Sequence, residues 1–472
     1  MNATSKKIAI IGGGISGLAA AYQCRKLDTE VSVTLFEATP KLGGVLQTEH
    51  VDGFVVEQSA DMFTTDPPFA LELCRELGKE DKLIQTREVA QRAFVACEDG
   101  IHPVPTGLSL MLPNRLDSIQ ETLILDEEGK KRMLAEQTIP PRMEEDDESL
   151  QSFAVRRFGQ QAFDRLIQPL VSGIYTADPE KLSMQATLER FRVMERNHGS
   201  LIDAAQAKAK PESETSASGA RYAIFRAPRN GMGEWVTWLA DATPNLDIRL
   251  NSGVTSITKT ESGWEVLTES GSQEFDALIV TSRAQASAKM LNPVDPELGG
   301  LLDSIESASS AIVIFGIDES QLAQKFPGFG IVMPHHLGRK AIALSFSSNK
   351  FENRAPDGKM LIRCFIGGAL QSELLEMNDG SLAELAWNEL NRAVGVSGQP
   401  GLVKVFRWNQ CMPQYHLGHL ERVKKITKRV EATAGLELAG NSYTGVGIPV
   451  CLQCGMDAAN RTLQYLNTLN RD

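Results

Sequence analysis

The chain has 472 residues, a length that exceeds one hydrophobic core and predicts two or three domains. Its formal net charge of −12 argues against a nucleic-acid partner, which needs a basic surface, and against strong electrostatic binding to anionic lipid. No apolar run approaches the roughly 20 residues of a membrane-spanning helix or resembles a signal peptide, so we expect a cytoplasmic protein with at most peripheral membrane contact.

The first predicted element is a buried parallel strand over residues 7–11, which are mostly apolar and β-branched. A glycine-rich turn follows at once, and residues 18–27 then predict an alanine-rich helix. A second strand over residues 31–36 ends at Glu37, about 20 residues after the last glycine of the turn. The turn consists of Gly12, Gly13, Gly14, Ile15, Ser16 and Gly17. This order and spacing predict a Rossmann-like dinucleotide site.

Each part of this unit has a physical task. Gly12 permits the tight turn, Gly14 lets a pyrophosphate approach the backbone, and Gly17 allows the helix to pack closely on the strand. The amino terminus of the helix offers free N–H groups to the phosphates. Glu37 is placed to accept hydrogen bonds from the adenosine ribose, and its charge disfavours a 2′-phosphate.

A second glycine motif follows the second strand. Residues 40–45 (PKLGGV) come directly after Glu37 and Ala38, and they resemble the second glycine motif of the flavoprotein superfamily that contains amine oxidases, phytoene desaturases and porphyrinogen oxidases. That family usually has an arginine before the glycine pair, where this chain has Lys41 and Leu42. Residues 53–58 continue the resemblance. It implies cofactor contacts from Ala38, Gly43, Gly44, Val45, Ser59, Ala60, Asp61 and Met62.

A matching signal stands near the carboxyl terminus. Residues 439–449 are glycine-rich and lead into a helix, as does the segment that returns to the flavin in this superfamily. The resemblance implies that Gly440, Val446, Gly447 and Ile448 lie at the flavin, that Val254 contacts the adenine, and that Trp408 touches the flavin. The two glycine-rich segments together favour FAD over NAD as the cofactor.

Segments in the middle of the chain indicate which members of the superfamily the chain resembles. Residues 158–183, 343–368 and 407–420 are similar to segments of the oxygen-dependent protoporphyrinogen and coproporphyrinogen oxidases. The sequence departs from that family at Ser59–Met62, where Gly-Pro-Asp-Ser is frequent, and at Val450, where an acid is common. The resemblance covers nearly the whole chain in order.

This resemblance implies an oxidase that acts on CH–CH groups and converts a porphyrinogen to a porphyrin in three two-electron steps. The flavin N5 accepts a hydride, and O2 reoxidises the flavin to give H2O2. No catalytic side chain is predicted, because the cofactor carries the chemistry. We expect an apolar slot in which Arg92 binds a propionate, Gly173 lies against a pyrrole and Phe346 stacks on the substrate. The alternative for Arg92 is an exposed surface arginine, for Gly173 a residue that ends a helix, and for Phe346 a residue of the hydrophobic core.

Several other residues could suggest chemistry. The seven scattered cysteines indicate free thiols in a reducing compartment, and Cys451 and Cys454 are interpreted as structural thiols on a helix. His416 and His419 have no converging cysteine or carboxylate in the sequence, so we expect packing or hydrogen bonding there. No metal site is predicted.

The predicted fold class is α/β, with a discontinuous Rossmann-like (GR2-type) FAD-binding domain, a mixed α+β substrate domain and a helical insertion. The FAD-binding domain is assigned to residues 1–90, 221–290 and 400–472, the insertion to 91–220 and the substrate-binding domain to 291–399. Residues 204–220 are low in complexity and predict a disordered loop. The acidic run 144–148 predicts a solvated linker or a helix start.

Four functions stay open at this point. The favoured substrate is coproporphyrinogen III, with four propionates, because an acidic chain without a membrane anchor suits a hydrophilic substrate. The alternative is protoporphyrinogen IX, with two propionates. An amine oxidase or carotenoid desaturase on the same fold is more remote, as is a non-catalytic flavin-binding sensor that uses the paired cysteines. A homodimer is also open.

Overall fold

The computed structural model describes residues 5–88, 92–208 and 224–469. Its first layer is a five-stranded parallel sheet in the order β12 (Asp247–Arg249), β2 (Ser32–Phe36), β1 (Lys7–Ile11), β16 (Ala277–Val280) and β22 (Leu436–Leu438). These strands come from both ends and the middle of the chain. The predicted α/β class with a discontinuous Rossmann-like domain is therefore confirmed.

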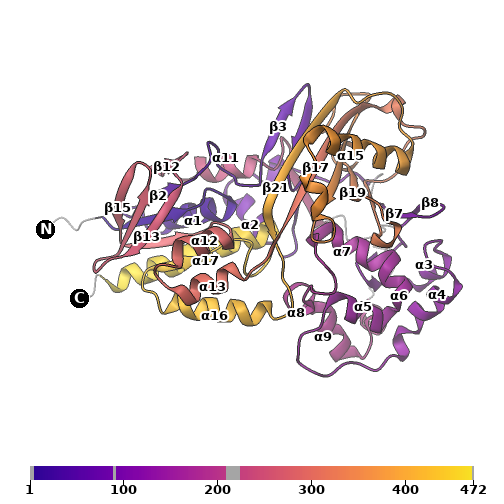
Figure 1. Ribbon diagram of the computed structural model, residues 1–472, viewed down its shortest axis with the longest axis horizontal. Helices are drawn as coiled ribbons and strands as arrows, with labels where there is room; N and C mark the ends of the chain where they lie inside the picture. Colours follow the sequence, from indigo (N-terminus) through magenta and orange to yellow (C-terminus); the bar gives the residue numbers. More distant parts are fainter. Residues whose placement is uncertain (1–4, 89–91, 209–223, 470–472) are drawn as a thin grey trace.

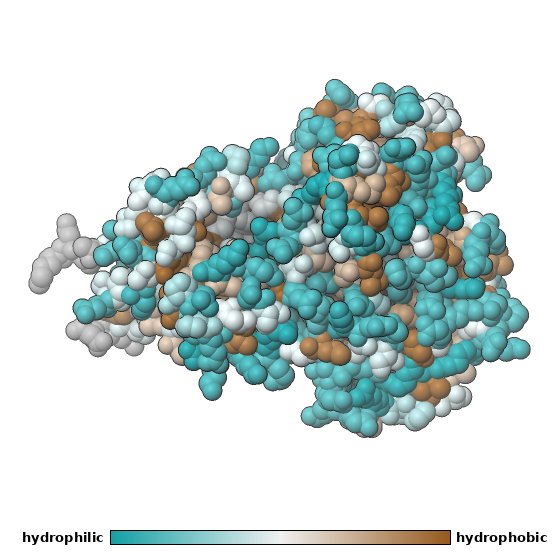
Figure 2. All heavy atoms as spheres, viewed as in Figure 1, coloured by the Kyte–Doolittle hydropathy of each residue, from teal (hydrophilic) through white to brown (hydrophobic). Residues whose placement is uncertain are grey.

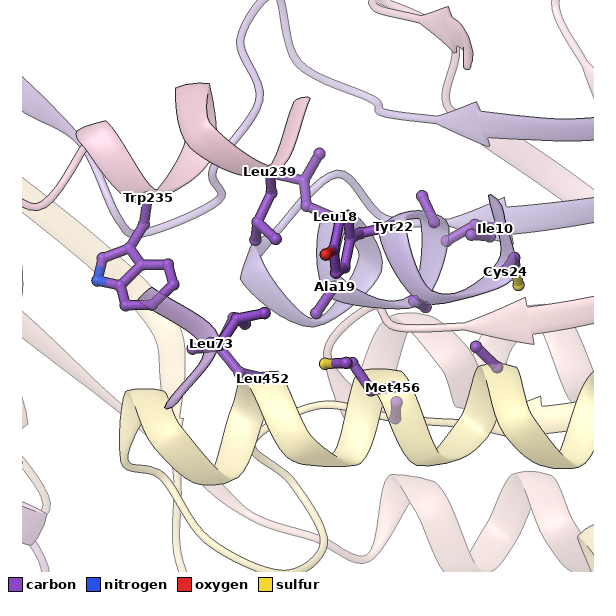
Figure 3. Packing of buried hydrophobic residues seen from close by; sticks show 14 of the residues in the cluster. Ile10, Leu18, Ala19, Tyr22, Cys24, Leu73, Trp235, Leu239, Leu452 and Met456 are labelled. Atoms are coloured by element: carbon purple, nitrogen blue, oxygen red, sulfur yellow. The ribbon is translucent and has the colours of Figure 1, made fainter. Parts of the chain in front are cut away.

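Three helices cover one face of this sheet: α1 (Ile15–Leu27), α17 (Ile448–Thr468) and α11 (Glu234–Asp241). Figure 3 shows Ala19 of α1 facing Met456 of α17, with Leu239 of α11 near the opposite side of α1. In Figure 1 the indigo α1 and the yellow α17 lie side by side. The alanines of α1 leave room for this approach, which brings the first and last helices of the chain into contact.

The other face of the parallel sheet packs on a second core. It is built from α12 (Ala284–Leu291), α13 (Pro296–Asp303), α16 (His419–Glu431) and the antiparallel strands β13 (Val254–Lys259), β14 (Trp264–Thr268) and β15 (Gly271–Phe275). Small strands complete this half of the molecule: β3 (Thr48–Val51) with β4 (Phe54–Glu57), and β5 (Phe63–Thr64), β11 (Phe225–Pro228) and β6 (Leu83–Gln85) beside α2 (Phe69–Glu76).

A seven-stranded sheet forms the second half. Its order is β21 (Leu402–Pro413), β17 (Ser307–Asp318), β20 (Lys359–Gly367), β19 (Ala341–Phe346), β18 (Gly330–Val332), β7 (Ala93–Cys97) and β8 (Gly100–Pro103). One face packs on α15 (Asp379–Val394). The opposite face packs on Phe54 and Val56 of β4 at one end and, through Val332, on the helical insertion at the other. Side chains alternate between these faces along each strand.

The helical insertion surrounds a third core. It contains α3 (Leu116–Glu121), α4 (Glu127–Leu134), α5 (Leu150–Phe158), α6 (Gln160–Ala162), α7 (Gln168–Tyr175), α8 (Met184–Thr187), α9 (Glu189–His198) and α10 (Leu201–Lys208), beside the strand pair β9 (Leu108–Ser109) and β10 (Leu112–Pro113). Arg157 is fully buried there and pairs with Glu136 and Glu195. Among the described residues, no helix is both long and apolar enough to cross a bilayer.

Several segments lie elsewhere than the sequence predicts. The hairpin β7–β8 belongs to the seven-stranded sheet and not to the insertion, and β21 joins the same sheet and not the FAD-binding unit. Helix α13, expected in the substrate domain, packs on the core of the parallel sheet. Strand pairing between distant segments decides these placements, and a hydrophobic pattern does not specify a partner.

Two local predictions also need correction. Residues 204–208, expected in a disordered loop, form the end of α10, where Ala204 and Ala205 are buried; residues 209–220 lie outside the described residues. The acidic run is only partly solvated, because Glu148 is buried and pairs with Arg156 at 2.9 Å. Residues 204–208 are helical because the alanines of α10 are buried in the core. Glu148 is buried because it pairs with Arg156 of α5.

Candidate active site

The first glycine turn leaves β1 and enters α1. Gly12 has φ +116°, and a β-carbon on Gly17 would overlap the carbonyl oxygen of Gly12. Gly14 precedes Ile15 and Ser16 as the N-cap of α1, and open space surrounds the position of its missing β-carbon. A phosphate group can therefore approach the free N–H groups at this helix terminus, as the sequence predicts.

Glu37 lies at the carboxyl end of β2 beside this turn. It is largely buried, and its carboxylate accepts hydrogen bonds from Gly13 N at 2.8 Å and Thr39 N at 2.9 Å. The carbonyl oxygen of Glu37 accepts from Ser252 N at 2.8 Å, which brings the start of β13, with Val254, next to Ala38. The residues expected around the adenosine are thus brought together, although Val254 is about 240 residues away from the turn.

The second glycine motif rests on the first. Gly43 N donates to Gly13 O at 2.7 Å, and Gly43 bridges Gly14 in parallel register. Gly44 has φ +59°, a conformation that favours glycine, and a β-carbon there would lie 3.5 Å from Gly14 Cα. Val45, the next residue, is exposed. The glycine pair therefore lines the open space in front of the first turn.

The carboxyl-terminal segment reaches the same place. Gly447 is the N-cap of α17, Ile448 is its first residue, and Ser16 Oγ donates to Cys451 O at 2.8 Å. A β-carbon on Gly455 would overlap the carbonyl oxygen of Ser16, so α1 and α17 touch backbone to backbone. Two helix amino termini thus lie side by side, an arrangement that favours a bound anion.

Other residues of this segment pack around the helix start. Gly440 N donates to Cys454 Sγ at 3.2 Å, and Val446 packs on the core of the helical insertion. Cys451 and Cys454 are free thiols, and burial raises the pKa of Cys451 to about 12. A thiol with so high a pKa is unreactive, in agreement with the interpretation that these cysteines are structural.

The segment Ser59–Met62 links the flavin site to the seven-stranded sheet. Trp408 Nε1 donates to Gln58 O at 2.6 Å, and Arg363 donates to Ser59 O. The other residues lie as follows: Ala60 is exposed, Asp61 is buried, and Met62 packs on the core below α1. The segment is therefore held by the sheet at its amino-terminal end and by the core around α1 at Met62.

Asp61 lies in a buried cluster of charged residues. It pairs with Lys350 Nζ at 2.8 Å and Arg363 Nη1 at 3.2 Å. Burial alone would raise its pKa, but the two cations outweigh burial and lower the pKa of Asp61 to about 2. Glu57 and Arg354 complete the cluster, and burial raises the pKa of Glu57 to about 7. Three cations thus face two carboxylates next to the segment expected at the cofactor.

Sequence reasoning missed this charged cluster. Lys350, Arg354 and Arg363 are 5, 1 and 1% exposed, although charged residues are rarely so deeply buried unless they are paired. Arg354 donates to Pro228 O at 2.9 Å and to Arg229 O at 2.8 Å, so the cluster also holds a third segment. Its partners are far apart in the sequence, and no local pattern could have identified them.

The residues expected at the substrate have different surroundings. Gly173 lies within α7, where a β-carbon would be 3.9 Å from Val332 Cγ1 of β18, so it is not a helix terminator. Arg92 is exposed, lies directly before β7, and its carbonyl oxygen accepts from Phe329 N at 3.1 Å. Because β7 pairs with β18, both residues border the same short strand.

The prediction for Phe346 is wrong. Phe346 is fully buried between the sheet and α15, with its ring 4.2 Å from that of Phe326. It opposes Ile362 in register, whereas Phe365 lies on the opposite face with Ala343 and Val332. Phe365, which is only partly buried, is therefore the aromatic residue on the face that Gly173 approaches. Strand parity is the signal that could have found it.

His419 has a structural role, whereas His416 Nδ1 lies 3.6 Å from Glu306 Oε1. His419 stacks on Tyr415 with ring centroids 4.0 Å apart, and His419 Nε2 lies 2.9 Å from Tyr443 O. Tyr415 OH donates to Asn441 O at 2.5 Å. This pair positions the segment before α17 by packing and hydrogen bonding, as expected.

Comparison with known proteins decides the family. A family model described as flavin-containing amine oxidoreductase matches residues 15–463. The chain belongs to this family. The predictions of an oxidoreductase and of the FAD cofactor are thereby confirmed, and the residues around the two helix termini fit that cofactor.

Full-length relatives within the family are porphyrinogen oxidases by name. The chain is 30% identical to the coproporphyrinogen III oxidase of Bacillus subtilis, over 99% of this chain and 100% of that protein. It is 26% identical to the mitochondrial protoporphyrinogen oxidase of Nicotiana tabacum, over 100% and 97% of the two chains. A crystal structure described as a candidate protoporphyrinogen oxidase from Exiguobacterium sp. 255-15 has a TM-score of 0.87 at 26% identity, over 98% of this chain and 99% of that one. The resemblance noted in the sequence is confirmed.

Proposed function

We propose that this flavoenzyme oxidises coproporphyrinogen III to coproporphyrin III, with O2 as the electron acceptor and release of H2O2. The observation that carries the proposal is the end-to-end match to a coproporphyrinogen III oxidase, combined with a helix that presents bare backbone to a sheet face. Gly173 is exposed and carries no side chain, so a flat ring can lie against the backbone of α7 at this position. The match with Exiguobacterium supports the same class of substrate.

Bound FAD would supply the hydride acceptor and the site of reaction with O2. The residues of the chain bind the FAD and orient the substrate. We assign cofactor binding to three groups: the turn Gly12, Gly13, Gly14, Ile15, Ser16, Gly17; the residues Glu37, Ala38, Gly43, Gly44, Val45, Ser59, Ala60, Asp61, Met62, Val254; and Trp408, Gly440, Val446, Gly447, Ile448.

Substrate orientation is assigned to Arg92 and Gly173. Among the described residues, none forms an ion pair with the Arg92 guanidinium, which leaves it able to bind a propionate. Gly173 gives the ring access to the backbone of α7. Phe365 takes the stacking role that the sequence assigned to Phe346.

The alternative substrate is protoporphyrinogen IX, which the tobacco relative's name supports. The test is to incubate the purified, FAD-loaded protein with each porphyrinogen under air and to follow porphyrin fluorescence together with H2O2. We expect faster oxidation of coproporphyrinogen III. Faster oxidation of protoporphyrinogen IX would reverse the assignment, and a colourless protein that takes up no added FAD would overturn the proposal.

We place the enzyme in the cytoplasm, with at most peripheral membrane contact, and as a homodimer. The mostly hydrophilic surface of the helical insertion, at the lower right of Figure 2, supports the limited membrane contact. Cell fractionation, flotation with anionic vesicles and light scattering after gel filtration test the three statements separately. Recovery in the membrane fraction, vesicle-bound protein and a monomeric mass are the contradicting results.

A further inference from the structure

A polar cavity lies beside the position of Gly173. It has a volume of about 30 Å³ and is bordered by the carboxyl-terminal half of α7 and by the residues between β18 and β19. Ser172 and Thr176, which flank Gly173 on α7, line one wall, and Met333, which follows Val332, lines the other. The cavity is therefore lined by the neighbours in sequence of the two residues that meet where Gly173 approaches the sheet. We call it the α7–β19 cavity.

Thr176 is strained and has a free hydroxyl. Its φ is +48°, in a left-handed region that β-branched residues rarely adopt. Its N–H donates to Ser172 O at 2.9 Å and its carbonyl accepts from Ala369 N at 2.8 Å, so the backbone is held on both sides. Thr176 Oγ1 is buried and has no hydrogen-bond partner in the described chain. Such strain and an unpaired buried hydroxyl are features of ligand sites.

Further hydrogen-bond donors surround this hydroxyl. Ser172 Oγ accepts from Gln168 Nε2 at 2.7 Å, which leaves its own proton for a ligand. Arg339 is held by Glu389, through Nε to Oε2 at 2.5 Å and Nη2 to the carbonyl at 3.1 Å, whereas its Nη1 has no partner within the part of the chain that the structure describes. The His335 side chain also borders the cavity.

The lining favours a carboxylate. Among the described lining residues there is no Asp or Glu, and the donors of Ser172, Thr176 and Arg339 are fixed in place. Glu389 neutralises Arg339, so recognition here depends on hydrogen bonds more than on net charge. Gln371 Oε1 is a buried acceptor without a described partner, and a water molecule bridging it to the carboxylate would satisfy it.

The size of the cavity restricts its occupant. A volume of 30 Å³ is about twice the roughly 10–15 Å³ that one water molecule needs. The cavity therefore accommodates a carboxylate group at the end of a flexible arm and not a tetrapyrrole ring. We propose that the α7–β19 cavity binds a propionate arm of the substrate, in addition to the arm at Arg92. This inference rests on the proposed function and makes the cavity a determinant of substrate choice.

The cavity can determine substrate choice because the two substrates differ in their number of propionates. Coproporphyrinogen III has four propionates, whereas protoporphyrinogen IX has two, and its vinyl groups accept no hydrogen bond. A vinyl group in the cavity would leave the donors of Thr176 and Ser172 unpaired, which is costly for buried polar groups. The cavity therefore favours coproporphyrinogen III.

The test uses Thr176→Val, Ser172→Ala and the double variant in the FAD-loaded enzyme. Valine keeps the β-branched shape and removes only the hydroxyl. In the double variant we expect the KM for coproporphyrinogen III and the Kd for the product coproporphyrin III, measured by fluorescence without turnover, each to rise about tenfold, as for about 1.4 kcal/mol. The KM for protoporphyrinogen IX should change less than twofold. Thr176→Ser, which keeps a hydroxyl, should bind coproporphyrin III as the parent protein does.

Thr138→Val is the matched control, because Thr138 is an exposed hydroxyl of the same insertion and lines no part of the cavity. Unchanged affinity for coproporphyrin III in the double variant would overturn the inference. An equal loss for both porphyrinogens, or an equal loss in Thr176→Ser, would also overturn it. If the parent protein retains FAD but oxidises neither porphyrinogen, the proposed function itself fails, so the two failures are distinguishable.

Discussion

Asp61 compensates buried positive charge next to the cofactor segment. In Asp61→Asn, Lys350 and Arg363 lose their shared carboxylate, and leaving a buried charge without its partner costs about 3–5 kcal/mol. We therefore expect a lower thermal unfolding temperature and release of FAD at lower urea concentration, both measured by flavin fluorescence.

Asp379→Asn is the control for this change. Asp379 pairs with Arg407, but its side chain is 65% exposed, and exposed pairs contribute about 0–1 kcal/mol. Equal stability losses in the two variants would contradict the assigned role of the buried cluster.

His419 makes stability depend on pH. Burial, opposed in part by the bond to Tyr443 O, lowers the pKa of His419 to about 4, against about 6.5 in the unfolded chain. Between these values the unfolded state binds the proton and the folded state does not. The free energy of unfolding is therefore not reduced by His419 above about pH 6.5. It falls as the pH drops from about 6.5 towards 4, by about 3 kcal/mol in total.

The measurement is the urea midpoint of the parent protein and of His419→Phe at pH 7.5 and pH 5. Phenylalanine keeps the stacking on Tyr415 and does not titrate. We expect the parent protein to lose more stability than the variant between the two pH values. Identical losses would show that His419 is not buried in its neutral form.

Alanine variants of Phe346 and Phe365 distinguish a residue of the core from a residue that contacts the substrate. Truncation of the fully buried Phe346 to alanine should cost about 3–5 kcal/mol of stability. Phe365→Ala, on the opposite face, should cost less stability and raise the KM for the porphyrinogen. Denaturant unfolding and steady-state kinetics of both variants check this difference. The reverse pattern would restore the assignment made from the sequence.

At the residue scale, the sequence predicted what depends on neighbours along the chain. The glycines of the first turn and Glu37 occur in one unit with fixed spacing, so their positions follow from local geometry. Phe346 was misassigned because one residue of strand parity decides the face. The partners of Asp61 are almost 300 residues away, and only the folded chain brings them together.

At the scale of elements, the contact between α1 and α17 has no room for an additional side-chain atom at Gly455. Alanine at Gly455 would place its β-carbon on the carbonyl oxygen of Ser16, so the two helices must separate and their amino termini with them. We expect Gly455→Ala to weaken FAD binding at least tenfold, measured by titration of the apoprotein with FAD.

Gly300→Ala is the matched control for this helix change. Gly300 lies in α13, is exposed, and has open space around the missing β-carbon, so alanine should stabilise the protein by up to about 1 kcal/mol. Unchanged FAD affinity in Gly455→Ala would contradict the importance of the close helix contact.

Elements with a local pattern were predicted, and those defined by long-range pairing were not. The strand, turn and helix at the amino terminus lie where the sequence places them. The strands β7, β8 and β21 were assigned to other units, because their partners in the seven-stranded sheet are remote in sequence. A helix end at Gly173 was the alternative to a substrate contact there, but α7 continues to Tyr175 and has the left-handed Thr176 as its C-cap.

At the scale of the whole molecule, one sheet is assembled from both ends of the chain. The order β12-β2-β1-β16-β22 places the last strand, residues 436–438, at an edge, and α17 then crosses to pack on α1. Both termini lie at the same end of the molecule in Figure 1. The substrate sheet and the helical insertion are inserted between these two parts.

Synthesis proceeds from the amino terminus, so the segment that completes the nucleotide pocket leaves the ribosome after the other elements of the fold. A nascent chain that stops before residue 436 lacks both β22 and α17 and exposes the apolar side of α1 to water. Flavin uptake would therefore follow the synthesis of α17, and the yellow colour of the protein would report that translation had passed this helix.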